Sequence, residues 1–218
     1  MSERPDPQAG TPARSRNAKV WAALFASWLG IPLLVLFGFS MADGERRAQE
    51  TPLRAVIGNA RFEALMAGEG GNPHYLGYER LAPDITLTDR NGEEWRLADH
   101  RGKVIVMNFW SITCGPCVEE MPTLELLAEM IDARFGGDVE LVAVSTDADW
   151  DAVSSILPEE PRLAHYFDPD KEVVEGAFGT QLYPETWIID AEGVIRFRYD
   201  GARDWSSPLM LDLIALFL

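Results

Sequence analysis

Two kinds of hydrophobic pattern divide this chain of 218 residues. Residues 20–42 form a stretch of 23 positions without a charged side chain, and most of these positions are apolar. About 20 such residues are enough for a helix to cross a bilayer, so the pattern predicts a transmembrane helix over residues 20–42. From about residue 78 onward, short apolar runs alternate with stretches of helical periodicity, which predicts a globular domain over residues 78–218.

The pattern after residue 78 predicts alternating strands and helices. Apolar and polar residues alternate on both sides of a turn at 89–92, which indicates a β-hairpin. Residues 104–109 form a nearly continuous apolar run, as expected for a strand buried on both faces. Apolar residues then recur at helical spacing over 118–135, and a pair of glycines ends that helix. Further strands are expected at 139–144, 186–189 and 194–199, and further helices at 150–157, 171–178 and 209–218. This order predicts an α/β layered fold with a central mixed sheet.

Charges around the apolar segment predict its orientation. The first 19 residues are basic and poor in apolar side chains, so we expect a disordered tail over residues 1–19. Basic residues remain on the cytoplasmic side of a membrane, which places the N-terminus in the cytoplasm and the rest in the periplasm or its equivalent. The chain is then a single-pass protein of the cytoplasmic membrane that contacts the lipid bilayer through residues 20–42. Residues 43–77, with mixed charge, Pro and Gly, are expected to be a linker.

Two alternatives to an anchor remain for the apolar segment. Ser40-Met41-Ala42 is a small-x-small triplet that a signal peptidase could cut after Ala42. The run is longer than the apolar region of an ordinary signal peptide, which favours an uncleaved signal anchor. A buried core helix is the other alternative.

Composition excludes several functional classes. The 19 Lys and Arg residues stand against 35 Asp and Glu residues, giving a net charge of −16. Such a chain is a poor partner for nucleic acid, because neutralising phosphates requires clustered cations. Two cysteines and three histidines are too few for a disulfide scaffold, a zinc finger or a haem site. We therefore expect no metal ion and no cofactor.

The two cysteines carry the chemistry. Cys114-Gly115-Pro116-Cys117 lies between the predicted buried strand and the long helix. The N–H groups and the dipole at a helix N-terminus stabilise a thiolate, which lowers the pKa of the Cys114 thiol below the ordinary value. Cys114 is thus the expected nucleophile, and Cys117, further inside the helix, the cysteine that resolves a mixed disulfide. A zinc site, which would need two more ligands, and a purely structural disulfide are the competing interpretations.

The segment around these cysteines resembles a known family. Residues 108–122, NFWSITCGPCVEEMP, resemble the active-site segment of the thioredoxin superfamily, and most closely its membrane-anchored TlpA/ResA/DsbE branch. Ala82-Pro83-Asp84 with the hairpin, residues 167–170 and residues 183–190 are similar to other segments of that branch. The resemblance covers about residues 78–218. It implies a thioredoxin-like mixed sheet flanked by helices, with the hairpin as an N-terminal addition.

The resemblance also implies roles for residues near the cysteines. Pro184 should follow a cis peptide bond and lie against the cysteine pair, where the backbone of Tyr183 pairs with the substrate; an ordinary trans turn proline is the alternative. Glu120 matches an acidic residue that exchanges a proton with Cys117, the alternative being a solvated carboxylate. Thr113 and Trp110 are further candidate substrate contacts, although Trp110 could instead be apolar support.

Two departures from the family pattern bear on those roles. Many relatives carry Trp immediately before the first cysteine, where this chain has Thr113, so the aromatic wall beside the thiol is missing. Thioredoxins proper carry a buried Asp where this chain has Asn108. Asn108 cannot take a proton, which puts more weight on Glu120. His165 would affect the redox poise only if it lies near the cysteines, and a loop histidine without such a role is the other interpretation.

These observations together indicate an extracytoplasmic thiol:disulfide oxidoreductase that reduces exported proteins, with apocytochrome c among the possible substrates. A membrane electron donor of the DsbD/CcdA type would re-reduce the pair. Gly-Pro between the cysteines resembles reducing thioredoxins rather than strong oxidants. An oxidant that introduces disulfides and a thiol-based copper metallochaperone remain as alternatives.

Overall fold

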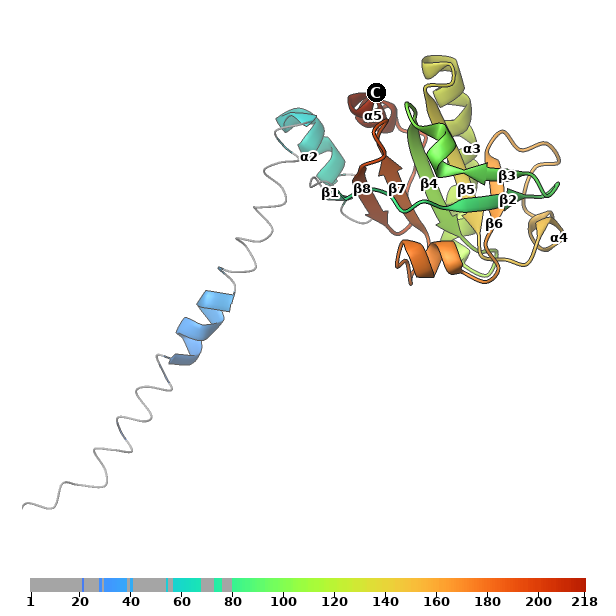
Figure 1. Cartoon of the computed structure of the whole chain (residues 1–218). Helices are drawn as coiled ribbons and strands as arrows, with labels where there is room; N and C mark the ends of the chain where they lie inside the picture. Colours follow the sequence, from blue (N-terminus) through green and yellow to red (C-terminus); the bar gives the residue numbers. More distant parts are fainter. Residues whose placement is uncertain are drawn as a thin grey trace, which may run out of the picture. The chain divides into compact units, whose positions relative to one another are not determined.

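The computed structural model describes residues 21, 28, 30–38, 40, 54, 57–67, 73–75 and 80–218, which Figure 1 colours along the sequence. Contacts divide the chain into two units, Met1–Arg47 and Ala48–Leu218. The expectations for residues 1–19 and for cleavage after Ala42 lie outside the described residues.

The second unit contains a mixed sheet of eight strands within the described residues, in the order β1-β8-β7-β4-β5-β6-β2-β3 (Figure 1). Strands β4, β5 and β6 are parallel neighbours, and all other pairs are antiparallel. The predicted mixed sheet and the predicted hairpin of β2 and β3 are therefore confirmed. The strands are β1 (Pro73–Tyr75), β2 (Thr86–Asp89), β3 (Glu94–Arg96), β4 (Val104–Trp110), β5 (Val139–Ser145), β6 (Ala164–Phe167), β7 (Glu185–Ile189) and β8 (Ile195–Asp200).

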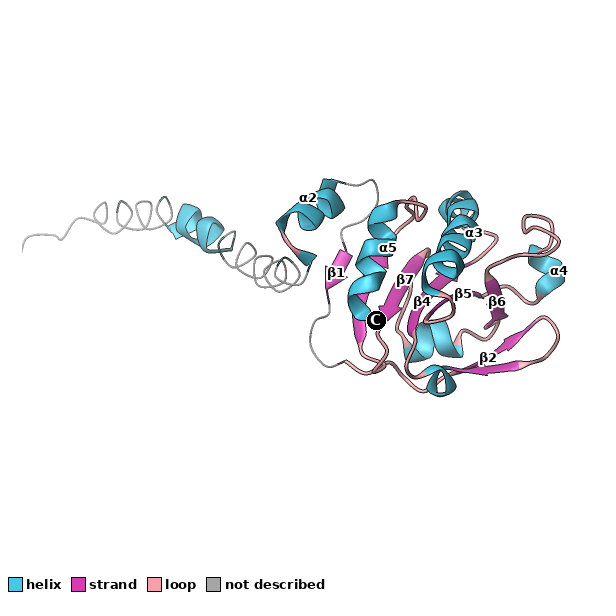
Figure 2. Ribbon diagram, turned by 90° about the horizontal axis from the view of Figure 1, so that it is seen from above, coloured by secondary structure: helices cyan, strands magenta, loops and turns pink. Residues whose placement is uncertain are grey.

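Helices cover both faces of this sheet, and Figure 2 shows α3 and α5 together on one face. The core on the other face includes side chains from β2, from β3 and from η2, a short π-helix. Two separate apolar cores result, one on each side of the sheet. The helices are α2 (Asn59–Ala67), η1 (Leu97–His100), α3 (Gly115–Phe135), α4 (Trp150–Val153), η2 (Glu172–Ala177), α5 (Pro208–Ile214) and η3 (Ala215–Phe217).

Strand β4 lies at the centre of the sheet, between β5 and β7. All seven of its residues are buried. Successive side chains of a strand point to opposite faces, so Val106 contributes to the core beneath α3, while Met107 contributes to the core on the hairpin side. Burial on both faces is the reason that the sequence shows a continuous apolar run here instead of an alternation.

The expected linker over residues 43–77 is wrong in its described part, because this part belongs to the folded unit. Strand β1 pairs with β8 and so covers the backbone groups of an otherwise free sheet edge. Ile57 and Phe62 are 2% and 3% exposed and belong to the same apolar core as Met210 of α5. The folded domain therefore begins before residue 78.

Three other element boundaries differ from the expectation. Strand β6 had no clear pattern in the sequence, since it is short and lies near the sheet edge. The helix expected over 150–157 ends at Val153. The helix expected over 171–178 is the π-helix η2, which follows Lys171 in a left-handed backbone conformation with φ 58°.

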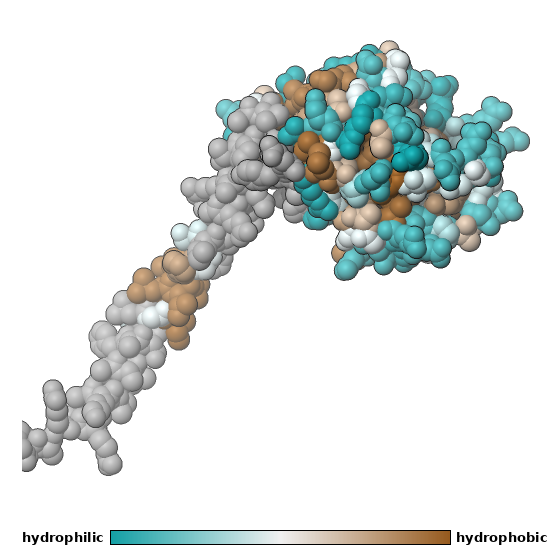
Figure 3. Space-filling view, in the orientation of Figure 1, coloured by the Kyte–Doolittle hydropathy of each residue, from teal (hydrophilic) through white to brown (hydrophobic). Residues whose placement is uncertain are grey.

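The described residues of the first unit are helical. Within the described part of the chain, no helix combines the length and the apolar character required to cross a membrane. Side chains of residues 31–38 are exposed and most are apolar (Figure 3). Leu34, for example, is 72% exposed.

Candidate active site

The cysteine pair lies where the central strand meets the longest helix of the second unit. Strand β4 ends at Trp110, and α3 begins at Gly115 with Cys114 as its N-cap. The Cys114 sulfur accepts a hydrogen bond from the Cys117 backbone N–H at 3.2 Å. The two cysteines form a disulfide with their Cα atoms 5.3 Å apart. Cys114 is partly exposed, whereas Cys117 is completely buried, so only the first sulfur is open to a partner.

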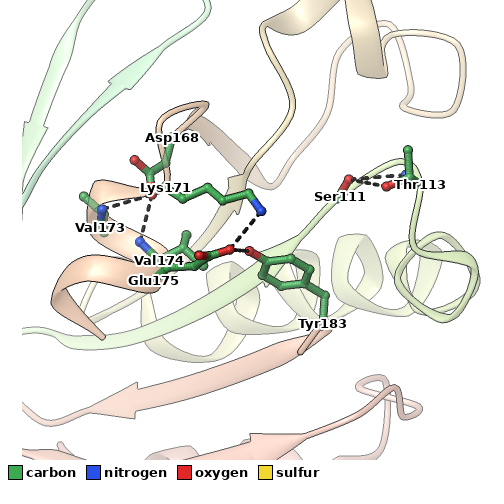
Figure 4. Close-up of polar contacts among 8 residues, drawn as sticks. All are labelled: Ser111, Thr113, Asp168, Lys171, Val173, Val174, Glu175 and Tyr183. Atoms are coloured by element: carbon green, nitrogen blue, oxygen red, sulfur yellow. Dashed lines mark hydrogen bonds and ion pairs between the residues drawn. The ribbon is translucent and has the colours of Figure 1, made fainter. Parts of the chain in front are cut away.

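Asp147 holds the loop that precedes the cysteines. It follows β5, the parallel neighbour of β4, and accepts hydrogen bonds from Ser111 Oγ at 3.0 Å and from Ile112 N at 2.8 Å. Ser145 Oγ donates to the same carboxylate at 2.7 Å. Ser111 Oγ is also 3.0 Å from Thr113 Oγ1 (Figure 4), which leaves Thr113 exposed beside Cys114. The loop is thus fixed from the neighbouring strand.

The Tyr183–Pro184 peptide bond is cis, as the family resemblance implies, so the alternative of an ordinary trans proline does not hold. Strand β7 starts at the next residue, Glu185, which pairs with Phe109 near the end of β4. Pro184 therefore lies at the same end of the central strands as the loop that leads from β4 to Cys114.

Tyr183 extends from this position toward η2 (Figure 4). Its hydroxyl group donates to Glu175 Oε1 at 3.5 Å, and the same oxygen accepts from Lys171 Nζ at 2.8 Å. Burial raises the pKa of the Tyr183 phenol. The phenol therefore stays neutral under ordinary conditions and can donate a hydrogen bond.

A groove of about 580 Å³ adjoins the cis-proline loop. Tyr183, Pro184 and Leu182 line it together with Arg198 and Asp200 of β8. Leu182 is 82% exposed, so its apolar side chain is accessible to a partner at this groove. The groove combines an apolar rim with an ion pair between Arg198 and Asp200.

Glu120 is buried behind the cysteine pair. It lies one helical turn after Cys117 on α3 and is 3% exposed. Its carboxylate accepts three hydrogen bonds, from Asn108 Nδ2 at 2.9 Å, Trp205 Nε1 at 3.0 Å and Arg203 N at 3.1 Å. Burial raises the pKa of the Glu120 carboxyl group, although these hydrogen bonds act in the opposite direction. The alternative of a solvated surface carboxylate is therefore excluded.

Trp110 does not reach the surface. It is completely buried in the core beneath α3, so its expected contact with substrate is not supported, and it remains as apolar support. His165 lies on β6 and not in a loop, with its ring edge-on to Trp110 at 5.9 Å between centroids. Its Nε2 lies 3.6 Å from the Glu125 carboxylate. His165 thus packs against Trp110 and lies close to Glu125.

Two polar contributors to this site were not foreseen from the sequence. No sequence pattern linked Asp147 to the site, because the strand that positions it is far from the cysteines along the chain. Trp205 is completely buried and donates to Glu120 across 85 residues. No local pattern in a single sequence reports such a long-range hydrogen bond.

Comparison with known proteins agrees with this geometry. The profile of the AhpC/TSA family matches residues 79–198, which is more than half of the chain. The chain belongs to the AhpC/TSA family. A thioredoxin-like protein, YneN of Bacillus subtilis (strain 168), is 30% identical over 143 residues, covering 60% of this chain and 78% of that protein. The thiol-disulfide oxidoreductase ResA of the same strain is 30% identical over 144 residues, covering 66% of this chain and 76% of ResA.

A solved structure supports the fold assignment. A protein from Chlorobium tepidum, assigned as the thiol:disulfide interchange protein DsbE, superposes with a TM-score of 0.55 at 24% identity. The match covers 66% of this chain and 99% of the other. This AhpC/TSA member is a thioredoxin-like thiol-disulfide oxidoreductase of the ResA type, with Cys114 and Cys117 as its disulfide pair.

Proposed function

We propose that this enzyme acts outside the cytoplasm as a reductant of disulfides in exported proteins. The observation that carries the proposal is the asymmetry of the pair: Cys114 is accessible at a helix N-terminus, and Cys117 is buried below it beside a buried carboxylate. Such an arrangement separates an attacking thiol from a resolving thiol.

The reduced pair transfers two electrons to the substrate in two exchanges. The Cys114 thiolate attacks one sulfur of the substrate disulfide, which forms a mixed disulfide and releases the other substrate sulfur as a thiolate. Cys117 then gives its proton to the Glu120 carboxylate and attacks the Cys114 sulfur. This second exchange forms the Cys114–Cys117 disulfide and releases the remaining substrate sulfur, and each leaving thiolate takes up a proton. Glu120 returns its proton to solvent before the next cycle.

The cis-proline loop and Thr113 bind the substrate chain in this proposal. The backbone of Tyr183 pairs with an extended substrate segment, since Pro184 holds this residue at the sheet edge that carries Cys114. Thr113, exposed beside Cys114, contacts the residues flanking the substrate cysteine. The groove next to Tyr183 offers room for the continuation of that segment.

The proposed location rests on the N-terminal sequence. Residues 20–42 carry no charge and follow a basic segment, and the described side chains at 31–38 expose apolar surface to their surroundings. These features favour contact with a lipid bilayer and a catalytic domain in the periplasm. The oxidised pair then needs a membrane electron donor of the DsbD/CcdA type, and apocytochrome c is one candidate substrate, by resemblance to the ResA and DsbE branch.

Trapping in cells tests the proposal directly. The full chain with Cys117→Ser lacks the resolving thiol, so it should accumulate a mixed disulfide with its natural substrate, identifiable by mass spectrometry after non-reducing electrophoresis. The matched control Cys114→Ser should capture nothing. If the Cys117→Ser protein forms no mixed disulfide, or if a reporter fused after residue 218 is active only in the cytoplasm, the proposal is wrong.

The direction of electron flow is measured separately. Equilibration with glutathione gives the reduction potential of the pair, which should lie near −270 mV, as in reducing thioredoxins. A potential above about −150 mV would instead indicate an oxidant that introduces disulfides.

A further inference from the structure

Asn108 occupies a buried position between the two groups that the proposed mechanism uses. It lies on β4, completely buried, between Val106 and Trp110, which contribute to the core that also contains Cys117. Alternate residues of a strand share one face, so Asn108 points to the same side of the sheet as these two neighbours. This is the side on which α3 presents Cys117 and Glu120.

The orientation of the Asn108 amide group is fixed by its hydrogen bonds. Nδ2 donates to Glu120 Oε1 at 2.9 Å and to Thr186 Oγ1 at 2.9 Å. Both hydrogens of the NH₂ group are thereby used. The reverse orientation would turn the amide oxygen toward a carboxylate oxygen, and two acceptors repel each other.

The other end of the amide is unsatisfied. Among the residues that the structure describes, none donates a hydrogen bond to Asn108 Oδ1, although the side chain is fully buried. A buried acceptor without a donor is costly, and buried polar groups are normally hydrogen-bonded. In this structure Cys117 is part of the disulfide and therefore has no S–H group. Reduction creates one donor in this part of the core, the thiol of Cys117.

We propose that Asn108 is a positioning residue for the resolving cysteine, whose Oδ1 accepts the Cys117 S–H in the reduced enzyme while Nδ2 holds Glu120. The amide thus keeps the thiol and its proton acceptor side by side before resolution. When Cys117 loses its proton and closes the disulfide, Oδ1 loses its donor, and the oxidised state is the one seen here. This inference rests on the proposed function, since it assigns Asn108 a part in the resolving exchange.

The proposed hydrogen bond from the Cys117 thiol to Asn108 Oδ1 stabilises only the reduced protein. Its loss therefore changes the equilibrium between the protein dithiol and the protein disulfide, which can be measured. In this equilibrium, glutathione disulfide oxidises the protein dithiol to the protein disulfide and is itself reduced to two molecules of glutathione. Asn108→Leu removes the acceptor, so the equilibrium constant toward the protein disulfide should rise about fivefold, the size of one ordinary hydrogen bond. The hydrogen bonds from Asn108 to Glu120 and Thr186 exist in the oxidised state already, so at constant pH their loss largely cancels between the two states.

Val106→Ala is the matched control. Val106 lies on the same strand and the same face and is completely buried, but has no polar group. Its truncation should lower stability without changing the redox equilibrium constant. If the constants of Asn108→Leu, Val106→Ala and the unmodified enzyme agree within a factor of two, the proposal is wrong.

A spectroscopic measurement decides the question even if Asn108→Leu fails to fold. Cys114→Ser leaves Cys117 as the only thiol of the chain, so its infrared S–H stretch is a single band. Donation to Oδ1 should place this band at lower frequency in the folded protein than in the denatured protein. An S–H frequency that is the same in both states overturns the proposal. Failure of the proposed function appears differently, as absence of mixed disulfides with Cys117→Ser, while the S–H band keeps its folded-state shift.

Discussion

Removing the indole N–H of Trp205 should destabilise the protein in a way that depends on pH. Trp205→Phe deletes the hydrogen bond to Glu120 Oε2, which is 3.0 Å long in the native protein. The aromatic ring that remains can still contact Tyr199, whose ring lies edge-on at 5.4 Å between centroids. The substitution therefore isolates one polar interaction within a buried carboxylate site.

The expected loss in the free energy of unfolding depends on how strong the Trp205 hydrogen bond to Glu120 is when the carboxyl group is ionised and when it is neutral. A hydrogen bond to an ionised group contributes about 2 kcal/mol, and one to the neutral acid about 1 kcal/mol. The smaller ring adds about 1 to 2 kcal/mol for lost packing at every pH. Trp205→Phe should thus lower the free energy of unfolding by about 3 to 4 kcal/mol when Glu120 is ionised, and by about 1 kcal/mol less when it is protonated.

The sign of the pH dependence is fixed by the pKa of Glu120. Burial raises this pKa in the folded state, so Glu120 favours folding most below its unfolded pKa, and that contribution is lost as the pH rises through the folded pKa. Trp205→Phe removes one of the interactions that lower the pKa, so it raises the folded pKa further. The cost of the mutation should therefore grow from acidic to neutral pH.

Urea unfolding of the oxidised protein at pH values from about 4 to about 8 measures this growth. Trp110→Phe is the matched control: Trp110 is also completely buried, but its Nε1 has no hydrogen-bond partner among the described residues. The control should lose packing energy without a comparable change over the same pH range. If Trp205→Phe costs the same free energy at every pH, its indole does not stabilise an ionised Glu120, and the reasoning is refuted.

Three other substitutions test the parts of the structure around the site. Asp147→Ala should lower the free energy of unfolding by about 2 to 3 kcal/mol and speed hydrogen exchange at the Ile112 amide, since the active-site loop loses its anchor; unchanged exchange at Ile112 would contradict this. Leu182→Ser should change stability by less than about 0.5 kcal/mol, because the side chain is 82% exposed, while raising the KM for protein substrates but not for a small disulfide. If Leu182→Ser and the unmodified enzyme have equal KM values for a protein substrate, the groove beside Tyr183 does not bind that substrate. Leu124→Ala, at a fully buried position of α3, should cost about 2 to 5 kcal/mol in urea unfolding, and a smaller loss would mean that the core beneath α3 is loosely packed.

Local patterns were sufficient for the central part of the fold. The apolar run at 104–109 predicted β4, because a strand buried on both faces has no polar alternation to obscure it. The long helix α3 followed from its periodicity, and the hairpin of β2 and β3 from alternation around a turn. Strand β1 escaped prediction because three residues carry no period, and it is a strand only through its pairing with β8.

For the site, sequence by itself determined the identity of the reactive pair and its position at a helix start, since these depend on residues adjacent along the chain. It also placed Glu120 one turn after Cys117. The candidate role of Pro184 came from the family resemblance. Only the tertiary structure showed that Glu120 is buried and that its carboxylate accepts hydrogen bonds from three N–H donors. It also showed that Asp147 anchors the loop and that Trp110 is inaccessible. The reason is physical: burial and long-range hydrogen bonds arise where β4, β5 and the segment before α5 come together, and spacing along one chain does not encode which of these segments meet.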